Sequence, residues 1–218
     1  MASAIGIFGG TFDPVHFGHL RAALEARELL GLTDFRLLPA GTPPHRSGTM
    51  ASSKHRLAML QRAVAAYPEF RVDDRECRRN GNSYMTDTLV DIRLEAGDVP
   101  LVLIIGQDAA NGLDNWHDWP ALFDLAHLVI MGRPESKTSW SAALQTQIQP
   151  RLVRSSRELL KAPAGSVLPL QVTQLAISST DIRRRIQDGR SPRFLMPDTV
   201  IDYIVHKQLY FAGQARKG

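Results

Sequence analysis

Short apolar runs alternate with longer stretches of helical periodicity along most of the chain. The runs that predict strands are Ile5–Phe8, Phe35–Leu38, Phe70–Val72, Leu101–Ile105, Leu125–Met131 and Val167–Val172. The periodic stretches that predict helices are Phe17–Leu30, Lys54–Ala66, Tyr84–Glu95, Ser178–Gln187 and Asp198–Lys207. Leu101–Ile105 is apolar at every position, which is typical of a strand buried on both faces of a parallel sheet. The alternation therefore predicts an α/β fold with a single doubly wound, mostly parallel sheet and helices on both faces.

No internal repeat, low-complexity tract or interdomain linker interrupts this pattern. The segments 39–53 and 162–165 have the Gly, Pro, Ser and Thr content of loops. A chain of 218 residues can form one large α/β domain. We expect a single domain over residues 1–218, with the C-terminal helices (about 178–207) packed on the sheet.

Composition and charge narrow the class of protein. The net charge is +4, with twenty-one arginines and five lysines, which is no convincing nucleic-acid footprint. Arg183–Arg185 lies in a helical pattern, so we expect at least two of these arginines to be solvated. No apolar window approaches 18 residues, the first residues lack a basic signal region, and Cys77 is the only cysteine. These features predict a cytoplasmic protein without membrane or nucleic-acid partners.

The most informative segment is Gly6–Leu20, GIFGGTFDPVHFGHL, in which a strand ends in Gly9–Gly10 and a helix begins a few residues later. Glycines let a ligand approach the backbone closely, and a helix N-terminus attracts anions. His16 and His19, three residues apart on the first helical turn, place two imidazoles on one face. This pair predicts a phosphate site rather than an isolated surface or core histidine.

Two other interpretations of this segment fit less well. It is neither the GxGxxG dinucleotide fingerprint nor a Walker A loop, since no GK[ST] follows the glycines. Two histidines without cysteine or a third nearby ligand make a poor zinc site, so no protein-bound metal is predicted.

Later segments supply further candidates for binding. Asp108 follows the Leu101–Ile105 strand, where its carboxylate suits either a ribose hydroxyl or a helix N-cap. Trp116 is either a packing anchor or a flat surface for a ring, while Trp119 is expected in the core. The segment 178–180 offers three hydroxyls at a helix start, with Arg183 one turn later, which suits a polyphosphate or a well-capped helix.

Together these motifs resemble those of a known family. GGTFDPVHFGHL resembles the T/HxGH signature of the HxGH nucleotidyltransferase superfamily, and ISSTDIR matches that superfamily's ISSTxIR completely. Over nearly its whole length the chain resembles the bacterial nicotinate-nucleotide adenylyltransferases. The resemblance implies a Rossmann-like nucleotidyltransferase fold, in which the C-terminal helices carry the ATP-phosphate motif.

The resemblance also implies roles for individual residues. Those carried over to catalysis are His16, His19 and Arg183. Those carried over to ATP binding are Gly9, Gly10, Thr11, Phe12, His16, His19, Asp108, Ile177, Ser178, Ser179, Thr180 and Arg183. Those carried over to the acceptor are His45, Met85, Thr86, Trp116 and His117.

The acceptor motifs match the family with one departure. Trp116 corresponds to the tryptophan that stacks on the nicotinate ring, and the backbone N–H of His117 to the group that holds its carboxylate. His45 and Arg46, in PPHR, correspond to a segment that reaches the phosphates. The family pattern SYTxxTL reads SYMTDTL here, so Met85 replaces a threonine, and either a backbone N–H or Thr86 compensates for its hydroxyl.

The implied reaction is adenylyl transfer from ATP to the 5′-phosphate of nicotinate mononucleotide, giving deamido-NAD and pyrophosphate, with Mg²⁺ carried on ATP. Rival acceptors are nicotinamide mononucleotide, phosphopantetheine, FMN and a small phospho-alcohol. Class I aminoacyl-tRNA synthetases share an HxGH-like turn but are much longer and carry a Lys-rich second motif. A non-catalytic nucleotide-binding module would not need the two histidines. A homo-oligomer is allowed by the sequence.

Overall fold

The fold is built on one six-stranded sheet in which every neighbouring pair is parallel. The computed structural model describes residues 4–41, 50–132, 138–173 and 175–212. Its strands are β1 (Ile5–Gly10), β2 (Asp34–Pro39), β3 (Arg71–Val72), β4 (Leu101–Gly106), β5 (His127–Gly132) and β6 (Val167–Gln171). Their order across the sheet is β3-β2-β1-β4-β5-β6, so the chain winds outward from β1 and then crosses back to β4.

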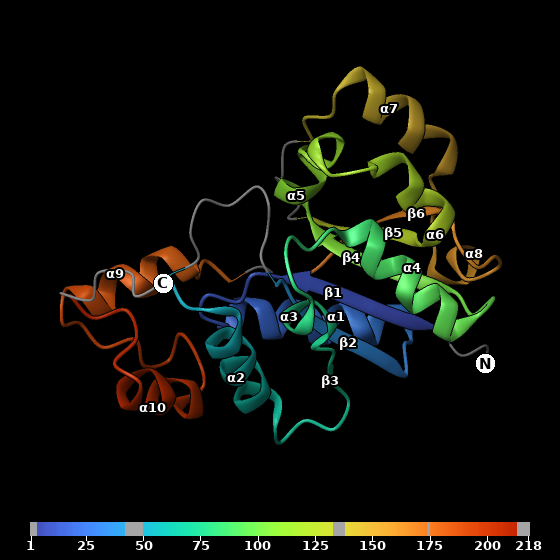
Figure 1. The fold of residues 1–218 in the computed structure, drawn as a ribbon. Helices are drawn as coiled ribbons and strands as arrows, with labels where there is room; N and C mark the ends of the chain where they lie inside the picture. Colours follow the sequence, from blue (N-terminus) through green and yellow to red (C-terminus); the bar gives the residue numbers. More distant parts are fainter. Residues whose placement is uncertain (1–3, 42–49, 133–137, 174, 213–218) are drawn as a thin grey trace.

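Helices cover both faces of this sheet (Figure 1). The longer ones are α1 (Phe17–Leu30), α2 (Ser53–Val64), α4 (Met85–Ala96), α9 (Ser179–Gln187) and α10 (Asp198–His206). The shorter ones are α3 (Arg75–Arg78), α5 (Gln107–Asn111), α6 (Leu122–Leu125), α7 (Ala142–Ile148) and α8 (Ser156–Leu159). Three 3₁₀ turns complete the described part, η1 (Leu113–Asn115), η2 (Trp119–Ala121) and η3 (Gln149–Arg151).

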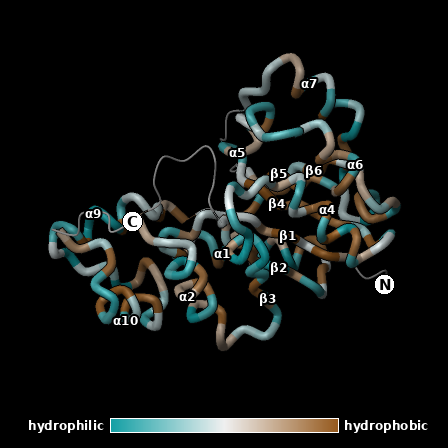
Figure 2. Tube along the Cα trace, viewed as in Figure 1, coloured by the Kyte–Doolittle hydropathy of each residue, from teal (hydrophilic) through white to brown (hydrophobic). Residues whose placement is uncertain are grey.

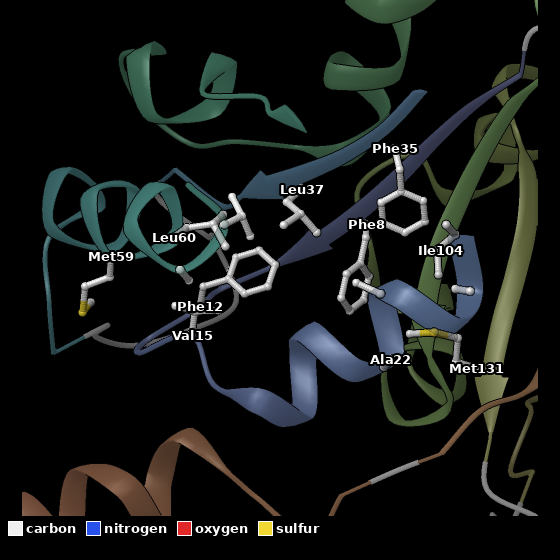
Figure 3. Packing of buried hydrophobic residues seen from close by; sticks show 14 of the residues in the cluster. Phe8, Phe12, Val15, Ala22, Phe35, Leu37, Met59, Leu60, Ile104 and Met131 are labelled. Carbon is white, nitrogen blue, oxygen red and sulfur yellow. The ribbon is translucent and has the colours of Figure 1, made fainter. Parts of the chain in front are cut away.

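The core divides into two layers because successive strand residues point to opposite faces. Phe8 and Ile104 belong to the layer beneath α1 and α2, which Figure 3 shows from close by. Ile7 and Leu103 belong to the layer beneath α4, α6 and α7. Both faces are thus buried, as the continuous apolarity of β4 requires. Figure 2 shows that hydrophobic residues are concentrated in the central strands, whereas α9 is more hydrophilic.

The C-terminal helices lie beside α2, beyond one end of the sheet (Figure 1). The main partner of α10 is α2. Val200 and Ile204 of α10 are buried in the same layer as Met59 and Leu60 of α2. The sequence-based expectation placed these helices on the sheet, whereas α10 packs chiefly on a helix that covers it.

The predicted doubly wound parallel sheet is confirmed, with differences at the element ends. The helix predicted at Phe17–Leu30 has those bounds, and it ends at Gly31, whose φ of 66° is the left-handed conformation that favours glycine. The strand predicted from Leu125 begins instead at His127, because Leu125 ends α6. The helices shorter than eight residues were not predicted, since they span too few residues to show a helical period.

No helix in the described ranges is long and apolar enough to cross a membrane.

Candidate active site

Two adjoining cavities open beyond the carboxyl ends of β1 and β4. The strand order reverses between these two strands, and ligands of open α/β sheets bind at such a switch point. The larger cavity has a volume of about 500 Å³ and the smaller about 290 Å³. Both are lined by Gly9, Gly10, Thr11, Gly106 and Ala109. Ligands in the two cavities would therefore meet at the end of β1.

The larger cavity brings together most of the residues predicted to bind ATP. Its lining includes Gly9, Gly10, Thr11, Phe12, His16, His19, Asp108, Ile177, Ser179, Thr180 and Arg183. Ser178 is the exception, because it lines a different and smaller hollow on the other side of α9. Its Oγ accepts a hydrogen bond from the Asp181 N–H at 3.1 Å, which makes Ser178 the N-cap of α9.

The rings of His16 and His19 lie against each other at this cavity. His16 is the N-cap of α1, and the two rings stack with centroids 3.7 Å apart. Phe12 is buried behind them and meets His19 edge to face, with centroids 5.1 Å apart. A Cβ on Gly18 would lie 2.9 Å from His16 Nδ1, so only glycine leaves room for the ring at this position.

Burial keeps both histidines neutral in the ligand-free protein. It lowers the pKa of His16 to about 4. It also lowers the pKa of His19 well below the usual value, and repulsion from His16, when that ring is protonated, lowers it further. The Nδ1 of His19 accepts a hydrogen bond from the His16 backbone N–H at 3.3 Å, so the proton of the neutral ring lies on Nε2. His19 can thus donate to a phosphate oxygen through Nε2, and a bound polyanion would favour the charged form of both rings.

The beginning of α9 is hydrogen-bonded to the loop between β1 and α1. Ser179 Oγ donates to the Pro14 carbonyl at 2.9 Å, and Arg183 Nη1 donates to the Asp13 carbonyl at 2.7 Å. Arg183 Nη2 also donates to Thr180 Oγ1 at 3.3 Å. These contacts hold one guanidinium at the cavity that contains the histidine pair. Arg184 and Arg185 are exposed, as the helical pattern of the arginine run predicts.

Asp108 stands in the first turn of α5, at the carboxyl end of β4. The N-cap of this helix is Gly106, so the capping role considered for Asp108 is wrong. Its side chain is exposed at the larger cavity, where a carboxylate can accept hydrogen bonds from hydroxyl groups of a ligand.

The smaller cavity contains the residues predicted to bind the acceptor ring. Met85, Trp116 and His117 line it together with Tyr84. The His117 and Tyr84 rings lie 4.3 Å apart between centroids. Thr86 Oγ1 donates to the His117 carbonyl at 3.3 Å, which ties α4 to the Trp116–His117 segment. The Thr86 hydroxyl is therefore engaged with backbone, and does not replace the hydroxyl that Met85 lacks.

Met85 is close to the shared edge of the two cavities. A Cβ placed on Gly9 would lie 3.1 Å from the Met85 methyl carbon, so the side chain reaches the backbone at the end of β1. The remaining predicted acceptor residue, His45, and its neighbour Arg46 lie outside the described residues.

Three polar residues that line the smaller cavity, Glu76, Ser83 and Tyr84, were not assigned to the site from the sequence. Ser83 and Tyr84 are the first two residues of the SYMTDTL motif and could have been named from it, whereas Glu76 carries no recognisable signal. Glu76 is buried, with Oε1 accepting from Thr88 Oγ1 at 2.8 Å and Oε2 from the Gly41 N–H at 3.3 Å. Burial raises its pKa. This carboxyl group thus joins the loop after β2 to α4.

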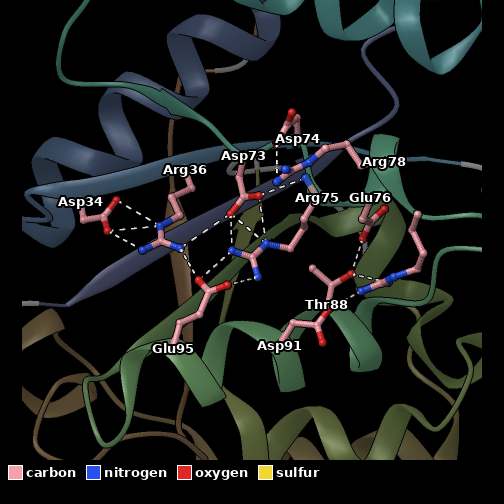
Figure 4. A network of polar contacts seen from close by, with 11 residues as sticks. Asp34, Arg36, Asp73, Asp74, Arg75, Glu76, Arg78, Thr88, Asp91 and Glu95 are labelled. Carbon is pink, nitrogen blue, oxygen red and sulfur yellow. Dashed lines mark hydrogen bonds and ion pairs between the residues drawn. The ribbon is translucent and has the colours of Figure 1, made fainter.

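The contacts of Glu76 belong to a larger polar network on the β2–β3 side of the sheet (Figure 4). Arg79 donates to Thr88 Oγ1 at 3.1 Å and pairs with Asp91. Nearby, Arg75 bonds both Asp73 and Glu95. Since Arg75 and Arg79 flank Glu76 and both reach α4, they hold one wall of the smaller cavity.

Within the described ranges, no group of three His, Cys, Asp or Glu side chains could hold a metal ion. Asp13, the carboxylate nearest the phosphate motifs in sequence, uses both oxygens to accept hydrogen bonds from protein groups.

Comparison with known proteins places this geometry in a family. The cytidylyltransferase-like family model matches residues 7–185. A probable nicotinate-nucleotide adenylyltransferase of Methylococcus capsulatus is 49% identical over 207 residues, covering 94% of this chain and 99% of the relative. One from Pseudomonas paraeruginosa is 45% identical over 213 residues, covering 97% and 99% of the two chains.

Solved structures agree on the fold. The Plasmodium falciparum nicotinic acid mononucleotide adenylyltransferase complexed with NaAD superposes with a TM-score of 0.71 at 15% identity, covering 95% of this chain and 97% of that one. A putative nicotinate-nucleotide adenylyltransferase from Vibrio parahaemolyticus gives 0.63 at 16% identity, covering 95% of each chain. Fold, motifs and full-length identity agree: the chain belongs to the nicotinate-nucleotide adenylyltransferase family of nucleotidyltransferases.

Proposed function

We propose that this chain transfers the adenylyl group of MgATP to the 5′-phosphate of nicotinate mononucleotide, forming deamido-NAD and pyrophosphate. The observation that carries the proposal is the pair of cavities that share Gly9, Gly10 and Thr11. One cavity contains the histidine pair and the start of α9, which suit a triphosphate, and the other contains an aromatic surface, which suits a pyridine ring. Their shared edge is where the α-phosphorus and the attacking phosphate would meet.

The reaction requires positioning of the substrates and stabilisation of charge more than it requires proton transfer. The attacking phosphate oxygen is already an anion, so no general base is required. It forms a bond to the α-phosphorus of ATP as the bond to the bridging oxygen of pyrophosphate breaks, and the electron pair leaves with pyrophosphate. Holding the two phosphates in line, and stabilising the charge that develops, supplies the rate enhancement.

Five of the predicted residues are assigned roles on the phosphates and the sugar in this displacement. His16 and His19 bind oxygens of the α- and β-phosphates, where N–H donors stabilise developing charge. Thr11 and Arg183 bind the departing pyrophosphate. Asp108 accepts from a ribose hydroxyl of the nucleotide. Mg²⁺, arriving with ATP, neutralises part of the triphosphate charge, since Asp13 is engaged within the protein.

The acceptor ring is proposed to bind in the smaller cavity. Trp116 provides the indole face for the cationic pyridinium, an attraction of about 0.5–2 kcal/mol. The carboxylate of nicotinate is bound by backbone N–H groups at the start of α4 and at His117, because the Thr86 hydroxyl already donates to the His117 carbonyl. A helix N-terminus also favours an anion over a neutral amide. His45 is assigned to the acceptor's phosphate.

Product analysis tests this proposal. The purified chain is incubated with MgATP and nicotinate mononucleotide, and the products are separated by chromatography, then identified and quantified by mass spectrometry. Deamido-NAD and pyrophosphate should form in equal amounts, and His19→Ala should abolish most of both. Formation of AMP without deamido-NAD would contradict transfer to this acceptor.

A further inference from the structure

A buried carboxylate lies in the loop between β1 and α1, residues 11–16, which we call the β1–α1 loop. Asp13 is only 4% exposed. Its Oδ2 accepts from the Met50 N–H at 2.8 Å, and its Oδ1 accepts from the Ala51 N–H at 3.2 Å and from the Tyr210 hydroxyl at 2.6 Å. The carboxylate is therefore bound by the backbone before α2 and by the end of the chain.

Tyr210 reaches this carboxylate from 197 residues away in the sequence. It follows α10 in a turn closed by a hydrogen bond from the Leu209 N–H to the Ile204 carbonyl at 2.9 Å. The residue is 4% exposed and has a φ of 66°, a conformation that bulky residues rarely adopt. Burial, together with the charge of Asp13, raises the pKa of the phenol, so its hydroxyl stays a donor at neutral pH.

Two arginine side chains hold the backbone of the same loop. Arg56, on α2, is fully buried and donates from Nη1 to the Thr11 carbonyl at 2.8 Å. Arg183, on α9, donates to the Asp13 carbonyl at 2.7 Å. The loop is thus anchored by α2, by α9 and by the chain end. A loop fixed on several sides keeps one conformation, which preorganises the groups that it carries.

We propose that the Tyr210–Asp13 hydrogen bond is a positioning contact through which the C-terminal segment holds the β1–α1 loop in the conformation that binds the ATP triphosphate. The inference rests on the proposed function, which assigns this loop to ATP. Tyr210 is a positioning residue, because it acts through Asp13 and the loop that leads into His16. Loss of its hydroxyl therefore weakens catalysis with ATP more than binding of the acceptor, because the loop contributes only Thr11 to the smaller cavity.

Two conservative substitutions separate this role from general stability. Tyr210→Phe removes the hydroxyl that bonds Asp13. Tyr203→Phe is the matched control: the Tyr203 hydroxyl also links the C-terminal segment to α2, by a 2.9 Å hydrogen bond with His55 Nδ1, but does not contact the β1–α1 loop. The ring contact between Arg62 and residue 203 survives in that variant, because phenylalanine keeps the π-face.

Steady-state kinetics and ligand-induced stabilisation are measured for both variants and the parent chain. We expect Tyr210→Phe to lower kcat/KM for ATP about 10-fold, since small displacements of positioned groups cost one to two orders of magnitude, with the acceptor KM changed less than about twofold. Tyr203→Phe should stay within about twofold on all constants. A non-hydrolysable ATP analogue should raise the Tm of Tyr210→Phe less than that of the other two proteins.

The inference is overturned if Tyr210→Phe matches Tyr203→Phe in kcat/KM for ATP and in the Tm shift with the analogue. It is also overturned if the acceptor KM rises as much as the ATP KM, because a general loss of structure would do that. The Tm shift of the parent chain with the analogue distinguishes failure of this inference from failure of the proposed function. A parent chain that the analogue does not stabilise would contradict ATP binding itself, and with it the proposed function.

Discussion

The rings of His16 and His19 stack with centroids 3.7 Å apart, and the Nδ1 of His19 accepts a hydrogen bond from the His16 backbone. His16 thus caps the N-terminus of α1, and its backbone N–H orients the His19 ring. The arrangement leaves Nε2 of His19 as a donor, at a cavity that also contains Arg183.

His19→Ala should lower kcat by about two to three orders of magnitude, the usual cost of removing one donor that stabilises transition-state charge. The folded state should lose little stability, because the side chain lines a cavity. Rapid-quench or continuous pyrophosphate assays give kcat, and thermal unfolding gives Tm. A kcat near that of the parent chain would remove His19 from the mechanism.

Trp116→Ala should raise the acceptor KM about 2- to 30-fold, the range that corresponds to loss of a cation–π contact of 0.5–2 kcal/mol. The ATP KM should change by less than about twofold, because Trp116 lines only the smaller cavity among the two. Trp116→Phe is the control, and it should recover most of the acceptor affinity. Equal increases in both KM values would argue against stacking.

Thr86→Val tests how the carboxylate of the acceptor is recognised. Because the Thr86 hydroxyl donates to the His117 carbonyl, its loss should loosen the Trp116–His117 segment for any pyridine nucleotide. The KM values for nicotinate and nicotinamide mononucleotide should therefore rise by the same factor. A rise confined to nicotinate mononucleotide would instead assign the hydroxyl to the carboxylate.

Acid should destabilise the ligand-free protein through its buried histidines. The pKa of His16 is lowered to about 4 in the folded state, while the unfolded chain has the ordinary value near 6.5. Between these values the unfolded state binds more protons, so the free energy of unfolding rises with pH. This stability is complete above about pH 6.5 and is lost as the pH falls toward 4. His19 and His127, whose pKa values burial also lowers, act in the same direction.

Urea unfolding at several pH values between 4.5 and 7.5 measures this dependence. His16→Gln should reduce the slope by up to about 1.4 kcal/mol per pH unit, the value for one proton. His206→Gln, at an exposed position of α10, is the matched control for the loss of an imidazole. A slope that both substitutions leave unaltered would contradict a buried, neutral His16.

The sequence predicted the sheet and much of the site because both depend on local patterns. The alternation of apolar runs and helices determines the parallel sheet, and the His16–His19 spacing brings the rings together within one turn. The short helix α6 was missed, so β5 was predicted to begin too early. Ser178 was assigned to ATP from its motif, whereas its hydroxyl caps α9 and lines another hollow.

What the sequence does not reveal is long-range contact. Nothing near Tyr210 indicates that its hydroxyl bonds Asp13, because the two residues meet only after α10 packs on α2. Glu76 is likewise one acidic residue in a charged stretch until the fold buries it against Gly41 and Thr88. Tyr210, Asp13 and Glu76 hold the segments that line the two cavities, and their roles follow from the tertiary structure alone.

MgATP and nicotinate mononucleotide are proposed to react at the shared edge of the two cavities. This proposal is tested most directly by pyrophosphate release from MgATP with nicotinate mononucleotide, nicotinamide mononucleotide or phosphopantetheine as separate acceptors. We expect a kcat/KM for the acid at least about tenfold above that for the amide, corresponding to about 1.4 kcal/mol, and no release with phosphopantetheine. Equal or greater turnover with the amide or with phosphopantetheine would contradict the proposal.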